Sequence, residues 1–150
     1  MALRWEQTEA ARKTLYSEKV THPVFVYGTM RRGQRNHARL CGARLLKQTH
    51  TAGRFHLWSR RTANGYPAPI AIPNGTKHVL GELYLVPGPV LADLDRAEGH
   101  PYVYERRHVR IDGHDRVVWM YVFPEQHLGN AVKTNTGIHS VGADKVEFRL

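Results

Sequence analysis

The stretch PVFVYGTMRRGQRNH, residues 23–37, passes from an apolar run into a small-residue turn and then into basic side chains. The apolar run 24–27 predicts a buried strand, since it is continuous and rich in β-branched and aromatic residues. Gly28 and Thr29 end it. Backbone amides freed at such a turn can converge on an anion or a carbonyl oxygen, because Gly28 has no side chain to block the approach. A plain connection, a phosphate cradle, a nucleic-acid contact and a small-molecule pocket all fit this pattern.

The composition indicates one globular domain. The chain has 150 residues, 41% of them hydrophobic and 23% charged, which is ordinary for a folded domain. No apolar run approaches the roughly 18 residues of a membrane helix, and residues 1–20 lack the apolar core of a signal peptide. The single cysteine, Cys41, excludes an internal disulfide and is expected in the core. We therefore expect a cytoplasmic protein without a membrane partner.

The formal net charge of +9 is the unusual bulk property. It favours acidic partners, whether nucleic acid, an anionic small molecule or an acidic carrier protein. In a nucleic-acid-binding module the contacts would come from Arg31, Arg32, Arg35, Arg39 and Arg44. No stacking aromatics are interleaved with these arginines and no nucleic-acid motif accompanies them. Nucleic acid is therefore the alternative partner, not the main one.

The order of elements predicts a mixed α+β fold. Strands are expected at 24–27, 43–55 and 79–86, with a short one at 68–72, and again at 102–111 and 115–123 around a DGHD hairpin connection. The clearest helix is PGPVLADLDRAEG, 87–99, with a proline in its first turn and Gly99 as its stop. Residues 3–20 suggest a helical arm, and residues 124–150 a partly irregular tail. Strands, one good helix and more strands favour a mostly antiparallel or closed sheet over βαβ winding.

Familiar catalytic motifs are missing from the sequence. It has no Walker-type phosphate loop, no dinucleotide fingerprint, no H-E-x-x-H helix and no G-x-S-x-G elbow. Its ten histidines are scattered without ligand spacing, so no metal site is expected.

Glu98 is the first candidate for chemistry. It ends the predicted helix beside Gly99, where the negative end of the helix dipole favours a protonated carboxyl group. If partly buried, such a group is a candidate general base, although an exposed helix-end glutamate is the plain alternative. Four aromatics on the following strands could wall a pocket or simply fill the core: Tyr102, Tyr104, Trp119 and Tyr121.

Six segments in the same order together resemble the gamma-glutamylcyclotransferase-like superfamily, closest to its short bacterial and gamma-glutamylamine cyclotransferase branches. They are VFVYGTMRRGQRNHARL, TAGRFHLW, NGYPA, HVLGELYLVP, LADLDRAEG and YVYERRHVRI. The resemblance covers residues 23–123. Met30 stands where the family's Tyr-Gly-Thr/Ser-Leu has leucine, LDRAEG places the family's essential glutamate at Glu98, and Tyr104 to Arg106 match its Y-x-R strand.

The resemblance implies a compact β-barrel flanked by short helices, with a cavity between the turn and the glutamate. It implies release of 5-oxoproline from a gamma-glutamyl amine or amide without metal or cofactor, with Glu98 as the catalytic acid and base. The substrate-binding residues would be Tyr27, Gly28, Thr29, Met30, Tyr104 and Tyr121. Residues 1–22 form an arm and 124–150 a tail that could cover the pocket or bind a partner.

The implied chemistry agrees with the missing motifs. A gamma-glutamyl group carries its own nucleophile, the α-amine, and intramolecular attack reaches effective molarities of about 10⁵–10⁸ M. The enzyme then needs a base, Glu98, and donors such as the amides of 28–30. The expected partner is a small gamma-glutamyl substrate, free or carrier-bound, and the chain would be a monomer or homodimer. The leaving group stays open: an amino acid, a polyamine, a lysine ε-amine or a carrier-bound chain. A family member that binds a ligand or a protein without turnover is a further alternative.

Overall fold

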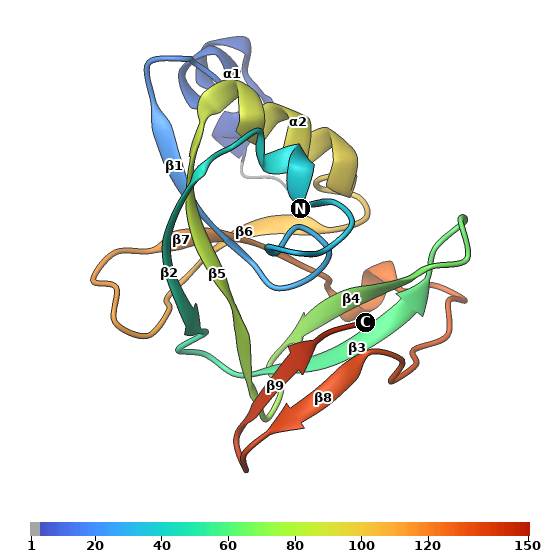
Figure 1. Ribbon diagram of the computed structural model, residues 1–150. Coiled ribbons are helices and arrows are strands. Elements are labelled where there is room, and N and C mark those ends of the chain that lie inside the picture. The colour runs from blue at the N-terminus through green and yellow to red at the C-terminus, as the bar shows by residue number, and fades with distance from the viewer. Residues whose placement is uncertain (1–3) are drawn as a thin grey trace.

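The computed structural model describes residues 4–150, in which strands predominate (Figure 1). The strands are β1 Thr21–Val26, β2 Arg44–His50, β3 Phe55–Arg61, β4 Pro67–Pro73, β5 His78–Pro87, β6 Glu105–Val109, β7 Val118–Val122, β8 Ile138–Val141 and β9 Lys145–Phe148. The helices are α1 Glu9–Leu15 and α2 Gly88–Glu98, with 3₁₀ turns η1 Arg4–Gln7, η2 His37–Leu40 and η3 Glu125–His127. The predicted α+β class is confirmed.

The main sheet has seven strands, in the order β6-β7-β1-β5-β9-β8, with β2 branching onto β5. Strand β1 pairs antiparallel with β5 and parallel with β7, and β5 pairs parallel with β9. The remaining pairs of this sheet are antiparallel, as the sequence predicted. The expected β-barrel is not confirmed, because the described strands do not pair into a closed ring. An isolated bridge between Thr51 and Ile111 joins the chain just after β2 to the chain just after β6.

Strand β1 lies at the centre of the packing. Val24 and Val26 belong to one buried apolar cluster, while Phe25 and Tyr27 belong to another. Because successive side chains of a strand point to opposite faces, both faces of β1 are covered. This double burial explains the continuous apolar run of the sequence.

The predicted strand 43–55 is divided. Strand β2 ends at His50 and β3 begins at Phe55. Between them the Thr51 hydroxyl donates to the Gly53 carbonyl at 2.7 Å and accepts the Val79 amide at 2.9 Å, so the chain turns there. Strand β3 then pairs along its whole length with β4 in a separate two-stranded sheet.

The tail contains regular structure. Strands β8 and β9 form an antiparallel pair beside the β3–β4 hairpin (Figure 1). The Thr134 amide donates to the Ser59 carbonyl at 2.8 Å and the Ser59 amide donates to the Thr134 carbonyl at 2.8 Å. Segment 124–150 is therefore joined to both sheets.

The predicted helix 87–99 is confirmed as α2. Its buried face includes Val90, Leu91 and Leu94, which recur at helical spacing. Gly99 ends it in the left-handed region at φ 67°, where a side chain would be strained. Glu98 is consequently held as the last helical residue.

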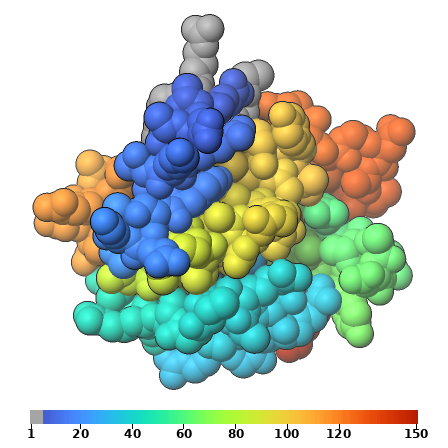
Figure 2. All heavy atoms as spheres, turned by 90° about the horizontal axis from the view of Figure 1, so that it is seen from above, coloured from blue at the N-terminus to red at the C-terminus, as the bar shows by residue number. Residues whose placement is uncertain are grey.

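The N-terminal segment packs against α2. The expected helix over 3–20 is shorter, comprising η1 and α1, and residues 1–3 lie outside the described range. Seen from above, α2 in yellow lies between this blue segment and the cyan segment that contains η2 (Figure 2). None of the helices in residues 4–150 is long and apolar enough to cross a membrane.

The expectation for Cys41 was wrong. Its side chain is exposed and its backbone adopts φ 53°, directly after η2. The apolar neighbours that suggested burial divide around this turn, so that Leu40 enters the core and Cys41 faces solvent.

Candidate active site

A cavity of about 430 Å³ lies where the end of β1, the C-terminal end of α2 and the β3–β4 hairpin meet. All seven site residues expected from the sequence line it: Tyr27, Gly28, Thr29, Met30, Glu98, Tyr104 and Tyr121. They come from segments up to 94 positions apart in the chain. The fold therefore brings the whole predicted set to one place.

The turn after β1 contains three backbone amides in residues that line the cavity. Within the described chain, the N–H groups of Gly28, Thr29 and Met30 donate to no other residue. Asn36 holds the turn, since its amide donates to the Thr29 carbonyl at 2.8 Å and its side chain to the Thr29 hydroxyl at 2.9 Å. Three unpaired donors in succession are suited to bind an anion or a carbonyl oxygen.

Gly28 is required for steric reasons. A Cβ atom at this position would lie 2.4 Å from Cγ of Pro69, which is closer than real contacts allow. Pro69 belongs to β4, so the missing side chain lets the turn pack directly against the hairpin. The glycine thus fixes the position of the three amides.

Glu98 is partly buried at the end of α2, and its carboxylate makes no hydrogen bond or close ion pair within residues 4–150. Burial raises the pKa of Glu98 to about 7, against the opposing charges of Arg60 and Arg39 and with a smaller raising contribution from Asp95. A carboxyl group with this pKa can gain and lose a proton near neutral pH.

The three tyrosines of the site use their hydroxyl protons elsewhere. The hydroxyl of Tyr27 donates to the Tyr121 carbonyl at 2.7 Å, and that of Tyr104 to the Pro69 carbonyl at 2.7 Å. The Tyr121 hydroxyl donates to Asp95 at 2.6 Å. Burial is the largest cause that raises the pKa of Tyr104, and the charge of Glu98 raises it further. Because these protons already go to acceptors of the protein, the three tyrosines are suited to form walls of the cavity.

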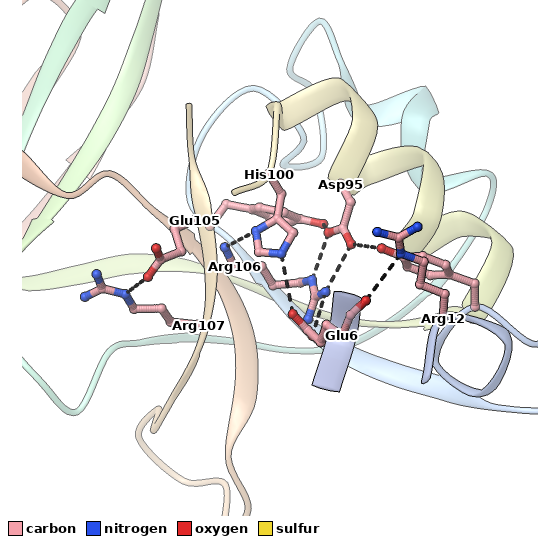
Figure 3. Close-up of polar contacts among 9 residues, drawn as sticks. Glu6, Arg12, Asp95, His100, Glu105, Arg106 and Arg107 are labelled. Carbon is pink, nitrogen blue, oxygen red and sulfur yellow. Dashed lines mark hydrogen bonds and ion pairs between the residues drawn. The ribbon is translucent and has the colours of Figure 1, made fainter. Parts of the chain in front are cut away.

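A buried ionic cluster lies on the side of α2 that faces the N-terminal segment (Figure 3). Arg106 donates to both oxygens of Asp95, at 2.8 and 3.1 Å, and to Glu6 at 3.0 Å. Asp95 also accepts hydroxyl hydrogen bonds from Tyr16 and Tyr121, each 2.6 Å long. Because Tyr121 lines the cavity, the cluster borders the site.

Sequence reasoning missed Arg60. This arginine of β3 lines the cavity with its guanidinium over the rings of Tyr104 and Phe123, 5.6 and 5.4 Å from their centroids. Its Nε is buried without a hydrogen-bond partner. No local signal marks it, because only the β3–β4 hairpin brings residue 60 against the end of α2.

The arginines considered for nucleic-acid binding have different surroundings. Arg35 and Arg39 line the cavity, whereas Arg31 lies 3.9 Å from Glu147 of β9 and Arg44 is exposed on β2. The aromatic set divides as well. Tyr104 and Tyr121 reach the cavity, Tyr102 is 84% exposed, and Trp119 lies under the Arg106 guanidinium at 4.1 Å.

Among residues 4–150, no group of three or more His, Cys, Asp or Glu side chains is arranged to hold a metal ion.

Comparison with known proteins gives the class. The family model "Gamma-glutamyl cyclotransferase, AIG2-like" matches residues 24–140, more than half of the chain, and the protein belongs to this family. A Vibrio cholerae protein with the provisional name gamma-glutamylcyclotransferase is 37% identical over 106 residues, which are 71% of this chain and 85% of the relative. Human gamma-glutamylaminecyclotransferase is 35% identical over 99 residues, 59% of this chain and 60% of the relative.

The fold has solved counterparts. A crystal structure of a mouse AIG2-like protein aligns with a TM-score of 0.60 over 73% of this chain and 83% of the other, at 24% identity. At this identity the likeness concerns the fold. Together with the family match, the named relatives make the protein an enzyme of the gamma-glutamylcyclotransferase class.

Proposed function

We propose that the protein releases 5-oxoproline from a gamma-glutamyl amine or amide, with Glu98 as general base and then general acid. One observation carries the proposal: an unpaired carboxylate with a pKa of about 7 lines the same cavity as three unpaired backbone amides. The first group suits proton transfer and the second suits a developing oxyanion. Family membership supports the same reaction class.

The steps balance without water or an enzyme nucleophile. Glu98 takes a proton from the substrate α-ammonium group, and the freed amine attacks the gamma-carbonyl carbon. The oxyanion that forms lies against the amides of Gly28, Thr29 and Met30. As the amide bond breaks, Glu98 gives its proton to the leaving nitrogen. The ring nitrogen still carries two protons after the attack, and one of them passes through Glu98 to the departing amine, which leaves as an ammonium ion. The ring nitrogen remains in 5-oxoproline, and Glu98 ends as a carboxylate.

The raised pKa of Glu98 matches this double role. A carboxylate with an ordinary pKa, about 4.3, is a weak base toward an ammonium group. At a pKa of about 7 the group is divided between its two forms at neutral pH, which favours transfer in both directions. The walls formed by Tyr27, Tyr104 and Tyr121 would exclude water and hold the substrate in the cyclising conformation.

The test is production of 5-oxoproline from gamma-glutamyl amines and dipeptides by the purified protein. Glu98→Gln should lower kcat by about 10²–10⁴-fold, the usual contribution of acid–base catalysis. Glu9→Gln, which changes an exposed acid of α1, is the matched control and should retain full activity. Turnover by Glu98→Gln at the wild-type rate would exclude this mechanism.

A further inference from the structure

The charge of the cavity points to the nature of the leaving group. Four arginines line it, and Glu98 is the one Asp or Glu among its described lining residues. The arginines are Arg35, Arg39, Arg60 and Arg96. A concave wall of one sign concentrates the electrostatic potential and attracts ligands of the opposite sign.

One of these charges is already neutralised. Arg96 donates to Asp93 at 2.7 Å, an exposed pair on the outer face of α2. Arg96 therefore offers no unpaired charge to a ligand in the cavity.

The other three arginines have no carboxylate partner in residues 4–150. The Arg39 side chain makes neither a hydrogen bond nor an ion pair, and Arg35 lies 4.2 Å over the ring of Tyr66. Arg60 is half-buried, with its Nε enclosed and lacking an acceptor. An enclosed donor without an acceptor is rare in folded proteins.

The gamma-glutamyl group of the substrate can pair with one of these three arginines. At its α-carbon it has one carboxylate and one ammonium group, and the ammonium belongs beside Glu98. Arg60, which lines the cavity with an enclosed Nε that lacks an acceptor, is the natural partner for the α-carboxylate. Arg35 and Arg39, both exposed at the mouth, then remain without a counter-ion.

We propose that the leaving amine carries an anionic group, a carboxylate or a phosphate, which Arg35 and Arg39 bind at the cavity mouth. The inference rests on the proposed cyclotransferase reaction and narrows its substrate. A polyamine leaving group would bring further positive charge against the two guanidinium groups. Each exposed arginine should raise kcat/KM for an anionic substrate about threefold. The two together give a preference of about tenfold over a neutral substrate, equivalent to roughly 1.4 kcal/mol.

The experiment compares kcat/KM, from 5-oxoproline release, within matched substrate pairs. Gamma-glutamyl-alanine against gamma-glutamyl-alaninamide tests a carboxylate, and gamma-glutamyl-phosphoethanolamine against gamma-glutamyl-ethanolamine tests a phosphate. Gamma-glutamyl-putrescine supplies the cationic extreme and should be the poorest substrate. A tenfold advantage of the anionic member in either pair supports the inference and identifies the anion. The advantage should shrink with added salt, because exposed charges are screened.

Variants test whether Arg35 and Arg39 cause the preference for an anionic leaving group. The double change Arg35→Gln and Arg39→Gln should bring the anionic-to-neutral ratio close to one. Arg44→Gln removes an exposed arginine of β2 outside the cavity and should leave the ratio as in the wild type. Equal rates within both pairs for the wild type would overturn the inference while the cyclotransferase reaction stands. Absence of 5-oxoproline from all five substrates would overturn the proposed function and this inference with it.

Discussion

Two carboxyl groups of α2, one helical turn apart, have opposite surroundings. Asp95 is buried and accepts four hydrogen bonds, two from Arg106 and one each from Tyr16 and Tyr121 (Figure 3). Glu98 faces the cavity and accepts none within the described chain. The difference separates a carboxylate that holds the fold together from one that remains available for a proton. Asp95 takes part in a network that joins α2 to β6 and the N-terminal segment. A buried acid without partners, such as Glu98, is a candidate functional group.

The largest expected effect comes from removing the satisfied acid. Asp95→Ala would leave the guanidinium of Arg106, 1% exposed, without its main counter-ion. Breaking such a buried pair costs about 3–5 kcal/mol. Asp93→Ala removes an exposed acid of the same helix and should cost at most about 1 kcal/mol. Urea denaturation measures both, and equal losses for the two variants would contradict the role given to Asp95.

The pH dependence of catalysis tests the unsatisfied acid. Because burial raises the pKa of Glu98 to about 7, the fraction of ionised base falls below neutral pH. We expect kcat/KM to drop about tenfold per pH unit below 7, and about hundredfold by pH 5. Initial rates in constant-ionic-strength buffers give the profile. A rate that holds level down to pH 5 would mean that Glu98 titrates as an ordinary exposed glutamate.

A change at Gly28 tests the role of the three backbone amides that share the cavity with Glu98. In Gly28→Ala the new Cβ would lie 2.4 Å from Cγ of Pro69, so the turn must move. Overpacking costs about 1–3 kcal/mol, and a displacement of about 1 Å in the amides lowers kcat by about 10². Gly53→Ala, where a Cβ meets nothing within 4 Å, is the control and should be nearly neutral. Unchanged kcat in Gly28→Ala would remove the amides of this turn from the mechanism.

The last expected effect is a gain of stability when the Glu98 carboxyl group is lost. A raised pKa means that the native state holds the Glu98 proton more tightly than the unfolded state. The stability from this proton is complete below about pH 4.5 and is lost as the pH rises through about 7. Because the pKa rises from 4.5 to about 7 and each pKa unit is worth about 1.4 kcal/mol, Glu98→Gln should be more stable than the wild type at pH 8 by about 3 kcal/mol, or roughly 6–12 °C in Tm. The two proteins should converge at pH 4, and a constant difference across this range would count against the burial of Glu98.

The parts of the site that local patterns encode could be read from the sequence. The apolar run 24–27 required a strand covered on both faces, and Gly28 and Thr29 ended it. The spacing of Leu91 and Leu94, followed by Gly99, defined α2 and placed Glu98 at its end. Short-range periodicity and capping are properties of neighbouring residues, so they can be recognised without knowledge of the fold.

The strand division at His50 and the position of Cys41 could not be read in this way. The chain turns at Thr51, where the hydroxyl accepts the amide of Val79, and this contact joins residues 28 positions apart, so residues 43–55 alone do not show it. Cys41 shares an apolar neighbourhood with Leu40, but one residue enters the core and the other faces solvent. Burial of individual residues in irregular turns depends on what packs over them, which composition does not record.

By itself the sequence determined the class of fold, the turn with its three amides, and the glutamate at the end of α2. Only the tertiary structure decided the surroundings of these groups. Arg60 lines the same cavity as Glu98 because β3 and β4 form a hairpin beside it, and Arg106 donates to Glu6 across 100 positions of the chain. Charges act through space and their strength depends on burial, so a pKa or a substrate preference is a property of the folded arrangement.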